Sequence, residues 1–400
     1  MLLAAIYTAL FTILIWKLPF FRGQISRKTI TAVFLLKVMI GLLYSYIYVK
    51  HYGGGDTHFY FRDSAYIVQT LPESPGKYLY LTLGPNGGKI PECIKPQVKA
   101  MGYWGNTSGY MVVRFNALVR LFSFGEFYVH AVFMAFVSLV GLIWLHRAAA
   151  LLIGNSTLLV LVVFFIPSVL FWGSGVHKEG LLLFSLGMFF WGTAGLVTYW
   201  RAVFLILMLT GAFLTYCIRD FVLLLLLPGW VVFLFAGRRK AGSTMILLSY
   251  LFFFLLTFSL PLFGTRNFLE MMAWKQDQFQ TIGGGNTYIP VPAFHPDWTV
   301  LFKNLPAALR NSLLGPFFIP VHHLYQLAVV VENALLIGGM MVIPFFRKLK
   351  VSPFGLWTGI FACCLLLLIG YIVPNVGAIV RYRSIVLPFL LLPWCPISRK

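Results

Sequence analysis

Four short motifs of ionisable residues stand at the ends of long apolar runs, where charged side chains are costly. In chain order they are Gly53-Gly54-Gly55-Asp56-Thr57-His58, Trp172-Gly173-Ser174-Gly175-Val176-His177-Lys178-Glu179, Arg219-Asp220, and Asn375 with Arg381-Tyr382-Arg383. Carboxylates can take a proton from a hydroxyl group, and guanidinium groups can hold a phosphate through two parallel hydrogen bonds. The motifs therefore predict acid–base chemistry on an anionic substrate.

Asp56 is the predicted catalytic base, and Glu179 is the competing candidate. The three glycines before Asp56 allow the backbone to turn sharply or to approach a ligand closely, and His58 is expected to help orient the carboxylate. Glu179 follows Lys178, whose positive charge favours the carboxylate form and makes Glu179 the weaker base. Glu179 would then be a structural partner or a metal ligand. The simpler interpretation of the Asp56 motif is a glycine-rich turn with a solvated carboxylate.

The remaining candidates form a predicted substrate-binding set: His58, His177, Lys178, Arg219, Glu332, Arg381 and Arg383. Arginine suits this role because its planar fork matches a phosphate group. Simpler interpretations stay open. The second motif can be an interfacial cap, and Arg219-Asp220 can be the tip of a helical hairpin. Arg381 and Arg383 can be arginines whose side chains reach out of a span to the membrane interface. No cofactor is certain from the sequence, the metal ligands are unknown, and a divalent metal ion is left open.

Composition predicts the elements that must position these residues. Of 400 residues, 60% are hydrophobic and only 10% are charged, against about 25% charged in soluble domains. A membrane span needs about 20 apolar residues. We therefore predict an all-α polytopic bundle, formed by a single integral membrane domain over residues 1–400. About eleven spans are expected, at 2–16, 30–49, 128–145, 156–172, 180–199, 203–217, 221–237, 244–263, 326–346, 353–373 and 384–396.

The distribution of charge predicts the orientation. The net charge is +20, from 31 basic and 11 acidic residues, and the basic clusters fall in alternate gaps between the predicted spans. By the positive-inside rule these gaps are cytoplasmic, which places the N-terminus outside, the C-terminus inside and every acid at the outer face. Two long outer loops, 50–127 and 264–325, are expected to carry short interfacial helices, and 108–124 is expected to be interfacial or re-entrant rather than a crossing.

Several segments resemble a broad class of bacterial membrane proteins found with envelope polysaccharide genes. The general layout also resembles the GT-C glycosyltransferases and the related O-antigen polymerases and ligases. The segments are Pro167–Gly175 with Lys178-Glu179, then Ile218-Arg219, Glu332-Asn333, and Gly377 with Val380–Arg383 and Pro388. The resemblance implies transfer of a sugar from a polyprenyl-phosphate donor at the outer face of the bacterial inner membrane. An acid in an early outer loop then acts as base or binds a metal. Asp56 matches that position, although it follows the second predicted span instead of the first.

The expected partners are a polyprenyl-phosphate lipid, a glycan acceptor and membrane lipids, and no nucleic acid. Two alternatives to single-sugar transfer stay open. One is a polymerase or ligase that joins lipid-linked glycans, with loop 264–325 holding the growing chain. The other is a transporter or flippase for a lipid-linked saccharide, which typically shows polar residues near mid-membrane and internal repeats. The acids lie at one face and no repeat is found, so the sequence favours the enzyme.

Overall fold

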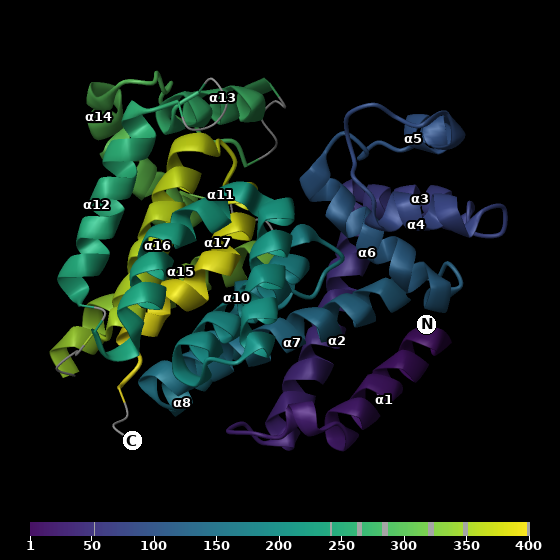
Figure 1. The fold of residues 1–400 in the computed structure, drawn as a ribbon, viewed down its shortest axis with the longest axis horizontal. Coiled ribbons are helices and arrows are strands. Elements are labelled where there is room, and N and C mark those ends of the chain that lie inside the picture. The colour runs from purple at the N-terminus through teal and green to yellow at the C-terminus, as the bar shows by residue number, and fades with distance from the viewer. Residues whose placement is uncertain are drawn as a thin grey trace. The chain divides into compact units, whose positions relative to one another are not determined.

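A computed structural model of the chain describes residues 1–51, 53–240, 242–261, 266–281, 287–318, 324–346 and 351–397. Within these residues there are seventeen α-helices and no β-strand, apart from one isolated bridge between Tyr288 and Asn375. The predicted all-α class is confirmed. Figure 1 shows the helices in chain order.

The first ten helices are α1 (Leu2–Lys17), α2 (Arg27–His51), α3 (Gly55–Val68), α4 (Pro75–Leu83), α5 (Lys95–Ala100), α6 (Thr107–Ser123), α7 (Phe127–Ile153), α8 (Thr157–Phe164), α9 (Pro167–Trp172) and α10 (Lys178–Tyr199). The others are α11 (Ala202–Lys240), α12 (Ser243–Ser259), α13 (Phe268–Thr281), α14 (Trp298–Leu309), α15 (Leu324–Phe346), α16 (Pro353–Ile372) and α17 (Val376–Leu391). Short 3-10 turns η1 (Pro19–Phe21), η2 (Glu92–Ile94), η4 (Gly315–Phe318) and η5 (Leu392–Trp394) and a π-helical turn η3 (Arg310–Leu314) complete the described elements.

Six helices in the described part of the chain are long and apolar enough to cross a membrane, which indicates a multi-pass membrane protein. They cover Arg27–Lys50, Phe127–Ile153, Lys178–Tyr199, Ala202–Ala236, Pro353–Ile372 and Val376–Trp394. Shorter apolar helices cover Leu2–Lys17, Ser243–Ser259 and Gln326–Val342. The count of eleven crossings stays a prediction.

The helix boundaries correct three of the predicted spans. Residues 203–217 and 221–237 were expected to be separate spans, but both lie in the single helix α11, so Arg219-Asp220 stands in mid-helix and not at a hairpin tip. The predicted span 156–172 is divided into α8 and α9. In the first case two adjacent opposite charges do not end a helix, since Arg and Asp leave the backbone hydrogen bonds intact. In the second, Pro167 cannot donate an N–H to the preceding turn.

The two predicted outer loops are largely helical where they are described. The first loop contains α3 to α6. The segment 108–124 is helical, as α6, and it is not among the six long apolar helices. The second holds α13 and α14. Residues 282–286, and the adjacent histidines at 322 and 323, lie outside the described residues. The membrane side on which these segments lie stays a prediction.

The chain folds as two compact units that are interleaved along the sequence. Unit 1 comprises Met1–Ala148, Val169–Gly192 and Arg201–Phe221, and unit 2 comprises Ala149–Ser168, Thr193–Trp200 and Val222–Lys400. Each unit is described by itself below.

In unit 1, α10 and α11 form a closely packed antiparallel pair. A Cβ atom added at Gly192 would lie 2.4 Å from the backbone nitrogen of Met208, and one at Gly211 would lie 2.5 Å from that of Phe189. Small residues of this kind let membrane helices approach closely. The paired positions follow one register away from the turn at Trp200: Gly192 with Met208, Phe189 with Gly211, Ser185 with Thr215, and Glu179 with Arg219. The register brings the second and third sequence motifs together.

In unit 1, two arginines of α6 join this helix to α3 and to the end of α4 by hydrogen bonds. Arg114 donates to the carbonyl of Gly84, and Arg120 donates to the carbonyl of Phe61 at 2.7 Å and to Ser64 Oγ at 3.1 Å. Each arginine therefore satisfies the end or the face of a neighbouring helix. These hydrogen bonds explain why α6 carries Arg114 and Arg120 among apolar residues: the two arginines hold neighbouring helices in place.

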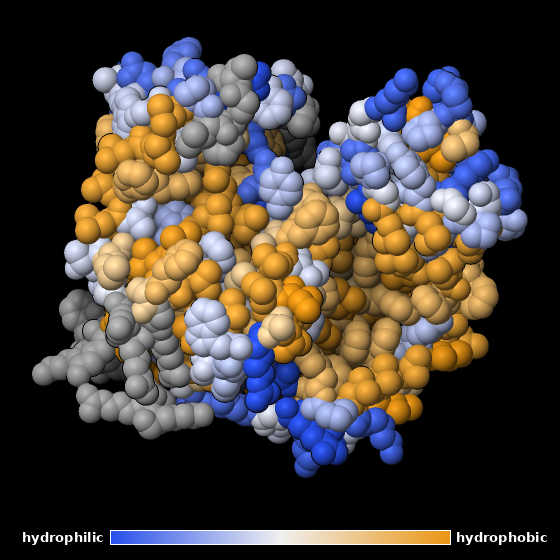
Figure 2. Space-filling model, in the orientation of Figure 1, coloured by the Kyte–Doolittle hydropathy of each residue, from blue (hydrophilic) through white to orange (hydrophobic). Residues whose placement is uncertain are grey.

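In unit 2, α16 is the central helix, in contact with α12, α13, α14 and α17. Figure 1 shows α13 and α14 lying across the ends of α12 and α16. Trp357 of α16 is fully buried, and its indole N–H donates to the carbonyl of Leu226 at 3.2 Å. In Figure 2 the visible face of α12 is hydrophobic, whereas α13 and α14 carry mostly hydrophilic side chains. This distribution suits a lipid-facing helix that ends below an interfacial layer.

Candidate functional site

The glycine-rich motif places Asp56 in the first turn of α3. Gly53, Gly54 and Gly55 have φ angles of 58°, 94° and 47°, a region that L-residues with a Cβ rarely adopt. The predicted sharp turn is confirmed, and it starts a new helix directly after α2. The side chain of Asp56 is 46% exposed, and its charge lies at the positive end of the helix dipole.

Tyr103, from the loop between α5 and α6, holds the carboxylate of Asp56. The Tyr103 hydroxyl donates to Asp56 Oδ1 at 2.7 Å, and the Tyr103 backbone N–H donates to Asp63 Oδ2 at 3.0 Å. The ring centroid of Tyr103 lies 4.5 Å from that of Tyr60. Burial, together with the hydrogen bond and the charge of Asp56, raises the pKa of Tyr103. Tyr103 therefore remains a protonated donor at neutral pH.

His177 stands between Asp56 and Glu179. Its Nε2 lies 3.8 Å from Asp56 Oδ2, and its Nδ1 bonds to Glu179 Oε2. The side chains of His177 and Glu179 are 1% and 0% exposed. The contacts of Nδ1 with Glu179 and with the backbone N–H of Lys178 fix the orientation of the ring, with Nε2 directed to Asp56. Asp56, His177 and Glu179 therefore form one chain of contacts.

Arg219 completes the chain of contacts from its position in the middle of α11. Its Nη2 donates to Glu179 Oε1 at 2.9 Å, and its side chain is 11% exposed. The two oxygens of Glu179 are thus divided between His177 and Arg219. The sequence motif suggested a guanidinium directed at a phosphate, but the structure engages Arg219 with a carboxylate of its own unit.

The segment between α9 and α10 lies along α2, which explains how His177 is held. A Cβ atom on Gly175 would lie 2.4 Å from the ring of Tyr44, and one on Gly41 would lie 2.7 Å from the carbonyl of Ser174. The glycines therefore permit a backbone contact that larger residues would block. In the same contact the fully buried Lys37 donates to the carbonyl of Gly173 at 3.3 Å.

The other predicted site residues of the first motif and the second motif have different surroundings. The exposed His58 ring lies against Phe61 and Phe127, with centroid distances of 6.3 and 6.2 Å, so Tyr103 rather than His58 contacts the Asp56 carboxylate. Lys178 is half-buried, and its backbone N–H lies 2.9 Å from His177 Nδ1. Arg219, forty residues further along the chain, pairs with Glu179.

Glu332, Arg381 and Arg383 belong to unit 2. Glu332 Oε2 accepts the backbone N–H of Ser168 at 2.6 Å, and the buried Arg383 donates to the carbonyl of Ser312 at 3.3 Å. Arg381 Nη2 lies 3.0 Å from the hydroxyl of Tyr382. The predicted set is therefore divided into a cluster around His177 in unit 1 and a second group in unit 2.

Sequence reasoning missed Tyr103, Asp63 and Lys37. Asp56 and Asp63 are seven residues apart, about two helical turns, so they lie on one face of α3. The spacing is informative only once a helix is known to begin at Gly55, which the sequence analysis did not predict. Lys37 is a single charge inside an apolar run, a recognised signal for function. Tyr103 has no comparable signal, because only the folded loop brings it to α3.

Within the described residues, no group of three or more His, Cys, Asp or Glu side chains is arranged to hold a metal ion. Comparisons of the chain with protein-family models, with curated proteins and with solved structures give no match.

Proposed function

We propose that this protein is a membrane transferase that moves a sugar from a polyprenyl-phosphate donor to a glycan or lipid acceptor, with Asp56 as the base. The observation that supports the proposal is the contrast in exposure along one chain of contacts. Asp56 is half-exposed, whereas His177 and Glu179 behind it are buried. A base must meet its substrate, and the groups that fix it need not.

The proposed reaction assigns a separate task to each group. Asp56 takes the proton of the acceptor hydroxyl as the acceptor oxygen attacks the anomeric carbon, and the bond from that carbon to the phosphate oxygen breaks. Tyr103 holds the carboxylate in place through its hydrogen bond, and His177 lies beside it. Glu179 and Arg219 fix the imidazole, so we assign Arg219 to positioning instead of phosphate binding. The bacterial inner membrane is the location that such a donor implies.

The leaving phosphate gains negative charge and needs a cation near it. Lys178 is the candidate within unit 1, because it is half-buried and directly precedes Glu179. Arg381 remains a candidate in unit 2. A Lys178→Met variant is therefore expected to weaken donor use, and Lys178→Arg to retain part of it.

The test is transfer by the full chain reconstituted in proteoliposomes with polyprenyl-phosphate sugars as donors. Asp56→Asn keeps the shape of the side chain but cannot take a proton, so we expect turnover to fall by about 10²–10⁴-fold. Glu73→Gln, a change at an exposed carboxylate of the same unit, is the matched control and should retain activity. Full activity of Asp56→Asn would exclude Asp56 as the base. The length of the product separates single transfer from polymerisation.

A second candidate is proton-coupled movement of a lipid-linked saccharide. The observation that favours it is the burial of Lys37, His177 and Glu179 in or beside apolar helices, since intramembrane ionisable groups often relay protons. An imposed pH gradient across proteoliposomes would then drive movement of a fluorescent lipid-linked saccharide. Movement without any transfer product would favour this candidate over the transferase.

A further inference from the structure

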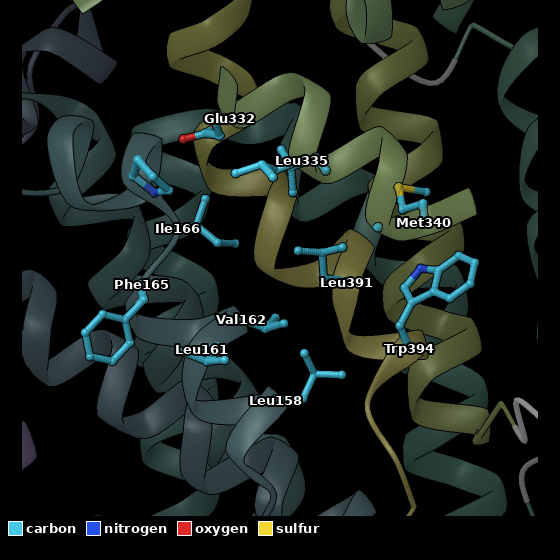
Figure 3. A pocket seen from close by; sticks show the side chains of 13 residues that line it. Leu158, Leu161, Val162, Phe165, Ile166, Glu332, Leu335, Met340, Leu391 and Trp394 are labelled. Carbon is cyan, nitrogen blue, oxygen red and sulfur yellow. The ribbon is translucent and has the colours of Figure 1, made fainter. Parts of the chain in front are cut away.

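A groove in unit 2 lies between α8, α15 and the end of α17 with η5, and its volume is about 290 Å³. Figure 3 shows side chains from these three elements facing one common space, among them Val162, Leu335, Leu391 and Trp394. Aliphatic and aromatic side chains form nearly all of its lining. Among the described residues that line it, Glu332 is the single charged one.

The apolar side chains around the groove indicate what solvent it meets. Leu335 is 72% exposed and Leu161 is 49% exposed, and both belong to apolar helices of a chain with several helices long enough to cross a membrane. Exposed apolar surface of this kind is rare on proteins in water but is covered by hydrocarbon in a bilayer. We therefore expect the groove to face lipid chains in a bilayer, where a hydrocarbon chain would fill it.

The charged residue of the groove restricts the headgroup that such a chain can carry. Glu332 is 8% exposed, and one of its oxygens accepts the N–H of Ser168. Arg383 is 4% exposed, donates to the carbonyl of Ser312 and does not line the groove. A phosphate would meet the carboxylate first and be repelled. A cation is less favoured because one oxygen of Glu332 already accepts the N–H of Ser168, and the described lining holds no second carboxylate. A neutral hydrogen-bond donor fits both conditions.

We propose that this groove is a binding site for a long-chain lipid alcohol, with the hydrocarbon chain between α8 and α15 and the hydroxyl donating to Glu332. The site goes beyond the transferase proposal, since it requires neither a phosphate donor nor Asp56. A hydrogen bond between the hydroxyl and the carboxyl group contributes about 0.5–1.5 kcal/mol, which corresponds to about a twofold to tenfold preference over a lipid without the hydroxyl.

Two adjacent glycines of α15 provide a matched test. Gly339 lines the groove and Gly338 does not, and a Cβ atom added to either meets no atom within 4 Å. Gly339→Phe should therefore fill the groove without a backbone clash, and Gly338→Phe adds the same side chain outside it. Both changes fall on one helix and alter its composition identically.

The probe is a diazirine-bearing hexadecanol added to the purified full chain in nanodiscs, with photolabelled peptides identified by mass spectrometry. We expect saturable labelling of α8 and α15, reduced about tenfold by Gly339→Phe and little by Gly338→Phe. Unlabelled hexadecanol should compete, and hexadecyl phosphate should compete poorly. Glu332→Gln should weaken labelling by the alcohol without weakening the interaction of hexadecyl phosphate.

Three outcomes would overturn the proposal. Labelling that does not saturate, or that falls equally in the two phenylalanine variants, would show that the groove is not the site. Better competition by hexadecyl phosphate than by hexadecanol would refute the headgroup assignment. If Glu332→Gln does not elute as a monodisperse species, the competition result with the unaltered chain still decides between the two headgroups. Loss of transferase activity in Asp56→Asn has no bearing on any of these results.

Discussion

Replacing Glu179 by glutamine removes the negative charge that lies between His177 and Arg219. The Glu179 side chain is fully buried, and the Arg219 side chain is 11% exposed. Glutamine can still accept one hydrogen bond, but the arginine charge then loses its carboxylate in a poorly solvated place. Breaking a buried pair from one side costs about 3–5 kcal/mol. We therefore expect Glu179→Gln to destabilise the protein by this amount.

The assay is equilibrium unfolding of the purified protein in mixed detergent micelles, followed by tryptophan fluorescence. Arg219→Met and the double variant complete a thermodynamic cycle. Arg219→Met should cost less than Glu179→Gln, because Glu179 keeps His177 as a partner. The double variant should be more stable than the sum of the two single effects predicts, by about 1 kcal/mol or more.

The exposed carboxylate of Glu126 provides the control. It lies 3.8 Å from the N-terminal amine, with side-chain exposures of 52% and 69%, and exposed pairs of this kind contribute less than about 1 kcal/mol. Glu126→Gln should therefore be nearly neutral. Additivity of Glu179→Gln and Arg219→Met within about 0.5 kcal/mol would refute the pairing on which the site depends.

Three further changes test other parts of the structure. Gly187→Val should destabilise unit 1 by at least about 1–3 kcal/mol in thermal unfolding, because a Cβ atom there would lie 1.9 Å from the carbonyl oxygen of Gly141. The control Gly242→Val should be tolerated, because a Cβ atom at Gly242 meets no atom within 4 Å. The pKa of Tyr103 is raised in the folded protein, so the stability that its protonated hydroxyl contributes is present below about pH 10, the pKa of a free tyrosine, and is lost above it. Between about pH 9 and pH 11, which bracket that value, the Tyr103→Phe variant should therefore lose less stability than the unaltered protein in the same unfolding assay. A cysteine at the exposed Thr107 should react with an impermeant maleimide from outside intact cells, and labelling only after the membrane is opened would reverse the predicted orientation.

Hydrophobic composition determined the all-α class and the positions of most long apolar helices, since a low charge content and runs of apolar residues leave few alternatives in a bilayer. The three glycines also indicated the turn before Asp56, because only the backbone freedom of glycine permits three successive positive φ angles. The sequence failed at 203–237, where an Arg-Asp pair seemed a natural break. Helix continuity depends on backbone hydrogen bonds, which these side chains leave in place, and Arg219 has a buried partner that local sequence does not reveal.

The tertiary structure decided which ionisable residues meet. Glu179 and Arg219 are forty residues apart, and they are neighbours because α10 and α11 pack antiparallel through Gly192 and Gly211. The Tyr103 loop reaches Asp56 only because α3 and α6 pack together. Sequence spacing fixes contacts within one helix, whereas contacts between helices depend on the register at which small residues allow two backbones to approach. The packing of α3 against α6 leaves Asp56 half-exposed, and the register of α10 with α11 buries Glu179 beside Arg219.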